Sequence, residues 1–134
     1  MHDYFEHDAD IGIIGRGNTV EEAFVSAARA LFSLESDPEQ LGQDVAIGVE
    51  FSEEDLEYAF ITWLNLLIAK AHSERIALRE FSLSREGSRW KGIAWGERWK
   101  EEMERGIEVK GATLTLLSVK KSGNLWEARS IVDV

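Results

Sequence analysis

Apolar positions recur at helical spacing in the first half of the chain. They follow the i, i+3, i+4 pattern of an amphipathic helix. These positions are Val20, Ala23, Phe24, Ala27, Ala28, Leu31 and Phe32. Thr19 precedes them and Glu22 stands three residues later, which is the capping-box arrangement that begins a helix. Because Pro38 cannot continue a helix, we expect this helix to span residues 19–35.

A second helical pattern is more apolar. Its main stripe consists of Leu56, Ala59, Phe60, Trp63, Leu64, Leu67 and Ala71. Further apolar residues widen the stripe, so we expect the most buried helix here, over residues 53–72. Ser52, followed by three acidic residues, is the expected N-cap. Asn65 interrupts the stripe and is expected to hydrogen-bond to a neighbouring backbone, and His72 is expected to interact with the helix dipole.

The remaining apolar patterns alternate with a period of two, as expected for strands. The predicted strands are 45–51, 76–85, 89–97, 107–121 and 125–134. Glycine-containing turns at 86–88 and 122–124 predict two hairpins. Gly111 interrupts the fourth of these strands, and residues 100–105 are polar and predict a connecting loop.

The N-terminal segment His-Asp-Ala-Asp-Ile-Gly-Ile, residues 7–13, combines acids with an apolar strand pattern. If it is extended, Asp8 and Asp10 share one face with Gly12, and the apolar side chains share the other face. The chain also places Asp133 within an apolar strand-like run at its other end. Two acid-bearing strands of this kind could converge on one site.

The order of elements predicts an α+β fold. We expect a two-layer sandwich, in which a largely antiparallel sheet carries the two main helices packed on one face. At 134 residues, the chain is expected to form a single domain over residues 1–134.

Composition limits the possible functions. The chain has no cysteine, which excludes disulfides and thiolate metal sites. It has neither an apolar run of membrane-spanning length nor a signal-peptide pattern, so we expect a cytoplasmic protein with no membrane partner. Its net charge of −10 opposes contact with phosphate backbones, so we expect no direct nucleic-acid binding. The sequence does not predict the oligomeric state.

The acids leave two interpretations open. Paired carboxylates bind hard cations such as Ca²⁺ and Mg²⁺, and they also support acid–base chemistry. Alternatively, Asp8, Asp10 and Asp133 are only surface charges at strand ends. Lys110, beside Gly111, either approaches these acids at a bulge or is a solvated strand residue.

Several segments together resemble the archease family. They are residues 6–13, 19–24, 63–65, 95–97, 108–113 and 132–134. Each match is short, but their order and spacing cover the whole chain. The family usually has threonine where this chain has Asp8, so the role of Asp8 is open.

The resemblance implies a function. Archeases assist the RtcB-type RNA ligase of tRNA splicing by stimulating its guanylylation and its multiple turnover, and they are not ligases themselves. The implied functional cluster is Asp10, Lys110 and Asp133. The implied metal ligands are Asp10, Asp133 and the carboxylate of Val134, with Ca²⁺ as the expected cation and Mg²⁺ or Mn²⁺ as alternatives.

Two other functions remain to be distinguished from ligase activation. One is a chaperone or adaptor with a purely structural acidic edge, in which the cluster could be neutralised without loss. The other is a stand-alone metal-dependent hydrolase, for which the sequence offers no evident nucleophile.

Overall fold

The computed structural model describes residues 2–7 and 10–134. Within them the chain forms helices α1 (Val20–Glu35) and α2 (Leu56–Glu74), and a short 3₁₀ helix, η1 (Pro38–Gln40). The strands are β1 (His2–His7), β2 (Asp10–Gly17), β3 (Val45–Ser52), β4 (Ile76–Glu86), β5 (Arg89–Arg98), β6 (Gly111–Ala112), β7 (Ser118–Ser122) and β8 (Leu125–Asp133). In the described part of the chain, neither helix is long and apolar enough to cross a membrane.

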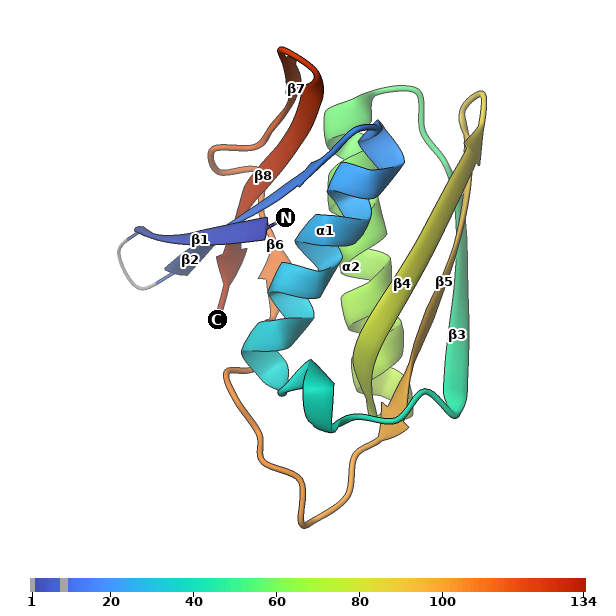
Figure 1. The fold of residues 1–134 in the computed structure, drawn as a ribbon, viewed down its shortest axis with the longest axis vertical. Helices are drawn as coiled ribbons and strands as arrows, with labels where there is room; N and C mark the ends of the chain where they lie inside the picture. Colours follow the sequence, from blue (N-terminus) through green and yellow to red (C-terminus); the bar gives the residue numbers. More distant parts are fainter. Residues whose placement is uncertain (1, 8–9) are drawn as a thin grey trace.

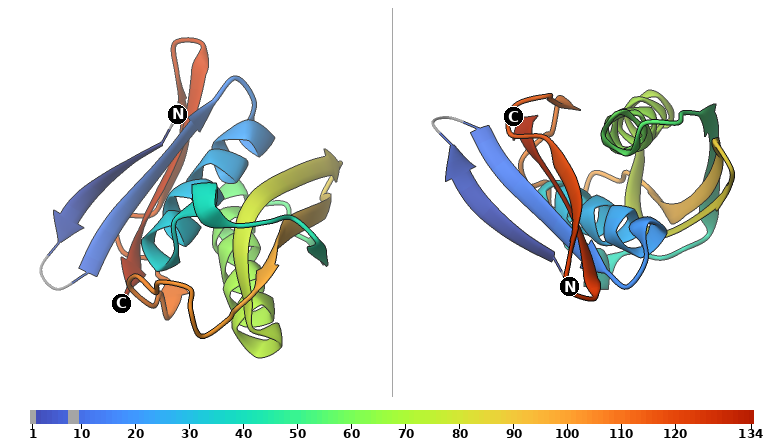
Figure 2. Two further views of the ribbon diagram at one scale, coloured as in Figure 1. Left: turned by 60° about the horizontal axis from the view of Figure 1, so that its bottom comes forward. Right: turned by 90° about the horizontal axis from the view of Figure 1, so that it is seen from above.

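The strands form two antiparallel sheets, with the helices between them (Figures 1 and 2). One sheet has the order β1-β2-β8-β6, with β7 also paired to β8, and the other has the order β3-β5-β4. The predicted α+β sandwich is confirmed. The expected single sheet is instead two sheets, and helix α1 is the reason for this difference.

Helix α1 is buried against both sheets. A Cβ atom on Gly15 of β2 would overlap the Ala23 carbonyl, so one side of the helix lies directly on the first sheet. On the other side, the Phe24 ring stacks on Trp90 of β5 with 5.3 Å between ring centroids. The small alanines of α1 allow this close approach, and a helix covered on two sides keeps the sheets apart.

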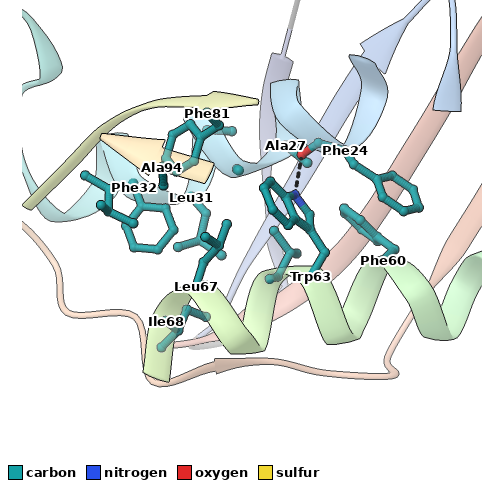
Figure 3. Packing of buried hydrophobic residues seen from close by; sticks show 14 of the residues in the cluster. Phe24, Ala27, Leu31, Phe32, Phe60, Trp63, Leu67, Ile68, Phe81 and Ala94 are labelled. Carbon is teal, nitrogen blue, oxygen red and sulfur yellow. Dashed lines mark hydrogen bonds between the residues drawn. The ribbon is translucent and has the colours of Figure 1, made fainter. Parts of the chain in front are cut away.

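Both helices pack on the same face of the three-stranded sheet, as predicted. Trp90 and Gly92 lie two residues apart on β5 and therefore point to one face. Trp90 contacts Phe24 of α1, and Gly92 faces the ring of Trp63 of α2, where a Cβ would overlap it. Trp63 is fully buried and donates its Nε1 proton to the Phe24 carbonyl at 3.0 Å (Figure 3).

The N-terminal acidic segment is not one continuous strand, so that prediction is wrong. β1 ends at His7 and pairs antiparallel with β2, and His7 is opposite Asp10. Asp8 and Ala9 lie outside the described residues, so the predicted face of Asp8 stays a prediction. From Asp10 onward the predicted alternation holds only in part: Ile13 is fully buried as expected, but Gly12 is buried as well, because the Phe5 ring covers its position.

The first helix begins as predicted and the second does not. The Thr19 hydroxyl accepts a hydrogen bond from the Glu22 amide, and the Glu22 carboxylate accepts one from the Thr19 amide, both at 3.1 Å. For α2, Asp55 is the N-cap and accepts from the backbone amides of residues 57 and 58. Ser52 cannot cap α2, because it belongs to β3 and pairs with Arg89 of β5.

The two hairpins are confirmed, and Gly87 and Gly123 adopt positive φ angles in their turns. The predicted strand 107–121 is wrong, because only β6 and β7 are strands within it. Ala112 pairs with Val132 and Ser118 pairs with Arg129. Residues 113–117 therefore lie opposite the shorter stretch 130–131 of β8. The surplus forms a loop that we call the 113–117 bulge.

Candidate functional site

The two predicted acids lie at the ends of neighbouring strands. β2 begins at Asp10 and β8 ends at Asp133, and the ladder between these strands includes the pair Ile11 and Val132. Asp10 and Asp133 therefore stand one step beyond that pair, at the same end of the sheet. Because side chains alternate along a strand, both point away from the buried face of Val132.

Lys110 joins this end of the sheet through its backbone. Its amide donates to the Asp133 carbonyl at 2.7 Å, and the following Gly111 pairs with Asp133. Val134 comes directly after Asp133, so all four predicted residues lie at the same end of the sheet, which forms the edge that a partner would meet. The start of β2, the end of β8 and strand β6 lie near one another in Figures 1 and 2. Asp133 and Lys110 are exposed and Asp10 is half-buried, so a partner can reach this edge from solvent.

The donors at this edge are hard oxygen ligands. Carboxylate oxygens suit Ca²⁺ and Mg²⁺, and Asp10, Asp133 and the carboxylate of Val134 would supply them. Among the described residues, no group of three or more His, Cys, Asp or Glu side chains is arranged to hold a metal ion. The assignment of Asp10, Asp133 and the carboxylate of Val134 as metal ligands therefore stays a prediction.

A buried glutamate holds the segment that leads to Lys110. Glu35, at the end of α1, is only 6% exposed. Its Oε2 atom accepts a hydrogen bond from the Val109 amide at 2.9 Å and lies 2.8 Å from Nε2 of His72. The Glu35 carbonyl also accepts from the Gly106 amide at 2.8 Å. The chain is thus fixed just before Lys110.

An asparagine fixes the same segment from α2. The Asn65 side chain accepts from the Ala112 amide at 2.9 Å and donates to the Ala112 carbonyl at 3.2 Å. Its predicted bond to a neighbouring backbone is confirmed. Lys110 therefore lies between two anchored positions, Val109 and Ala112, and its backbone has little freedom to move.

The prediction of functional residues did not include Glu35. Its spacing was a usable signal, because Glu35 follows Leu31 by four residues and so continues the apolar stripe of α1. His72 lies in the last turn of α2, where its interaction with the helix dipole was expected, and its ring also contacts Glu35. A buried acid usually has a hydrogen-bond partner, and Glu35 has two, the Val109 amide and the half-buried ring of His72.

A cavity of about 410 Å³ lies beside Glu35 and His72. Its walls include Glu35 and His72 together with Arg75, Trp99 and Arg105. The Arg105 guanidinium lies over the Trp99 ring, 4.1 Å from its centroid. None of the predicted cluster residues lines this cavity, so it is separate from the edge described above.

Comparison with known proteins identifies one family. Residues 2–134 match the model described as "Archease protein family (MTH1598/TM1083)". The chain is 32% identical to Protein archease of Sulfolobus acidocaldarius over 98% of this chain and 97% of the relative. It is 30% identical to Protein archease of Methanosarcina mazei, over 99% of this chain and 95% of that protein.

Two solved structures share the fold. The solution structure of Methanobacterium thermoautotrophicum protein 1598 matches with a TM-score of 0.87 and 28% identity, over 99% of this chain and 98% of the other. A crystal structure from Thermotoga maritima, described as an archease and possible chaperone, matches with a TM-score of 0.69 and 27% identity. That match covers 100% of this chain and 98% of the other.

Proposed function

Because this chain belongs to the archease family, we propose that it is a non-enzymatic accessory protein that stimulates an RtcB-type RNA ligase. In this proposal it acts in the cytoplasm during tRNA splicing, where it promotes guanylylation and repeated turnover of the ligase. One observation supports the proposal above others. The ends of β2 and β8 carry Asp10 and Asp133, and Lys110 directly precedes the neighbouring β6; these are the residues that the family resemblance implies.

The proposed role of the two acids is to hold a divalent cation. Asp10, Asp133 and the carboxylate of Val134 would repel one another without a compensating positive charge. Ca²⁺ accepts six to eight oxygen ligands in flexible geometry, which suits a strand edge better than the stricter octahedron of Mg²⁺. We therefore favour Ca²⁺, with Mg²⁺ or Mn²⁺ as alternatives.

Lys110 has a different proposed role. Its side chain is exposed while its backbone is fixed by the bond to Asp133. An ammonium group held in this way offers a point charge to an anionic group of the ligase or to a nucleotide phosphate. The net charge of −10 also favours docking to the basic surface of an RNA-binding protein.

The test is a nucleotide-loading assay of the cognate ligase with and without this protein. We expect Asp10→Ala, Asp133→Ala and Lys110→Ala each to abolish stimulation while the domain stays folded, because these residues lie at strand ends outside the core. Glu50→Ala and Lys91→Ala are matched controls, since this exposed ion pair lies on the other sheet. Normal stimulation by the three cluster variants would refute the proposed mechanism.

The same variants test the metal. Bound cation stabilises the folded state by linkage, so chelation is expected to lower the melting temperature of the wild type. Asp133→Ala is expected to lose this sensitivity to chelator, whereas Lys110→Ala keeps it because both carboxylates remain. If chelation leaves the wild-type melting temperature unchanged, the cation is not part of the site.

A chaperone or adaptor is the second candidate function. It is favoured by the description of the Thermotoga maritima structure, which names a possible chaperone. This alternative requires no cluster chemistry, so the cluster variants and the Glu50 and Lys91 controls would then behave alike. The loading assay separates the two functions, because only an activator changes the rate of guanylylation.

A further inference from the structure

The 113–117 bulge exposes two large apolar side chains. Leu114 is 60% exposed and Leu116 is 47% exposed. Single exposed leucines are common on protein surfaces. Two of them on one five-residue segment are less common, and they lie on the strand edge that carries Lys110. The bulge therefore presents apolar area beside the candidate site.

The bulge is held in one conformation by hydrogen bonds to β8. The amide and the hydroxyl of Thr113 both donate to the Ile131 carbonyl, at 3.0 and 2.8 Å. The Ile131 amide donates to the Thr115 carbonyl at 3.2 Å, and the Ser130 hydroxyl donates to the Thr113 carbonyl at 2.7 Å. A surface loop tied down in this way is ordered in advance, which lowers the entropy cost of docking.

Leu116 occupies a backbone conformation that suits glycine better. Its φ angle is +52°, and among the described residues Arg75 is the only other non-glycine residue with a positive φ. The hairpin turns of the same chain use Gly87 and Gly123 for nearly the same angle. A leucine here adds strain, and strained residues cluster at sites of function.

The bulge lies close to the candidate site. It is bonded to Ile131, two residues before Asp133 on β8, so a partner that covers Asp133 and Lys110 also meets the bulge. We propose that the 113–117 bulge is a docking element whose Leu114 and Leu116 side chains enter an apolar pocket on the ligase, beside its basic RNA-binding surface. This inference rests on the function proposed above.

Net charge favours the ligase over a second copy of this chain as the partner that the bulge contacts. Two molecules that each carry a net charge of −10 repel one another, whereas RNA-binding proteins carry a basic face. Asp133 lies at one end of β8, with Asp10 at the same end of the neighbouring β2, and Lys120 and Lys121 on β7 are exposed toward the other end of β8. Opposite charges at the two ends would also fix the orientation of docking.

The test measures binding and stability together. The double variant Leu114→Ser with Leu116→Gly is expected to weaken binding to the ligase at least about tenfold, as measured by calorimetric titration. The single variant Leu116→Gly is expected to leave the melting temperature unchanged or raised, because glycine relieves the positive φ. Tyr58→Ser and Ile93→Ser are the matched controls, since both remove exposed apolar groups elsewhere, and both are expected to bind as the wild type does.

Stimulation of the ligase by excess leucine variant distinguishes a loss of docking from a loss of function in the Asp10, Lys110 and Asp133 cluster. The leucine variants keep Asp10, Lys110 and Asp133, so excess variant is expected to restore full stimulation of the ligase. Tight binding by the double variant would overturn the docking proposal, and so would a large fall in melting temperature for Leu116→Gly. Loss of self-association in the double variant, measured by sedimentation, would also overturn it in favour of a contact between copies. A wild type that neither binds nor stimulates the ligase would instead refute the proposed function.

Discussion

At the scale of single residues, polar side chains inside the fold control the backbone beside Lys110. Asn65 satisfies both the amide and the carbonyl of Ala112, and Glu35 satisfies the amide of Val109. Backbone groups that are shielded from water and lack a partner are costly, so each of these side chains stabilises a conformation that the chain would not otherwise keep.

Asn65→Ala tests this control directly. The change leaves two part-buried backbone groups of Ala112 without their side-chain partner, at a cost of about 1–3 kcal/mol in the free energy of unfolding. We expect lower stability in denaturant titration and faster hydrogen exchange at the Ala112 amide. Gln43→Ala removes an exposed amide side chain and serves as the control. Unchanged exchange at Ala112 would show that Asn65 does not hold this strand.

Residue roles were predictable where the local pattern was unusual. Asn65 stood out because it interrupts an apolar stripe, and its role followed from that. The choice between Ser52 and Asp55 as the N-cap was not predictable, because both residue types cap helices well. What decides it is the pairing of Ser52 with Arg89 on another strand, which depends on tertiary structure.

At the scale of elements, turn chemistry was the most informative signal. Gly87 and Gly123 mark the two hairpins, since both adopt positive φ angles that glycine accepts. The 113–117 bulge could not be predicted in the same way. Leu114 and Leu116 alternate with threonines, so the sequence shows the period of a strand even though the register with β8 is broken.

Glu97, near the end of β5, connects this strand to two loops. Its carboxylate accepts from the Gly42 amide at 3.0 Å and lies 2.9 Å from Nζ of Lys100. The bond from Gly42, followed by the bond from Lys100, holds the pKa of Glu97 below its ordinary value. Since the folded pKa is lower than the unfolded one, Glu97 contributes stability above the unfolded pKa. That contribution is lost as the pH falls through the folded value.

The variant Glu97→Gln measures this contribution. We expect it to be less stable than the wild type near neutral pH, and the difference should shrink as the pH falls through the lowered pKa of the wild-type carboxylate. Urea titrations between about pH 7 and about pH 3 provide the measurement. A stability difference that stays constant over this range would contradict the assigned cause.

At the scale of the whole molecule, the net charge predicts that the protein does not bind RNA without a partner. With a net charge of −10, it gains nothing from releasing counterions of RNA. We expect no gel shift of tRNA by this protein at physiological salt, and a shift only when the ligase is added. Retardation of tRNA by low micromolar protein without ligase would contradict this expectation.

The overall architecture was predictable only in part. The order of helices and strands indicated the α+β class, and acids at both ends of the sequence suggested that these ends meet. The division into two sheets was not predictable, because it depends on α1 being covered from two sides. Periodicity shows which residues of a helix are buried, but not how many layers cover them.

The central position of β8 in its sheet has a consequence for the order of folding. It pairs with β2 on one side and with β6 and β7 on the other, although it follows all of them in the sequence. During synthesis β2 emerges long before this neighbour, and their pairing closes a loop that includes most of the chain, which slows the step. The edge that carries Asp10 and Asp133 therefore forms only when this last closure occurs. A nascent or partly unfolded molecule lacks the complete edge, so a partner that recognises it selects fully folded protein.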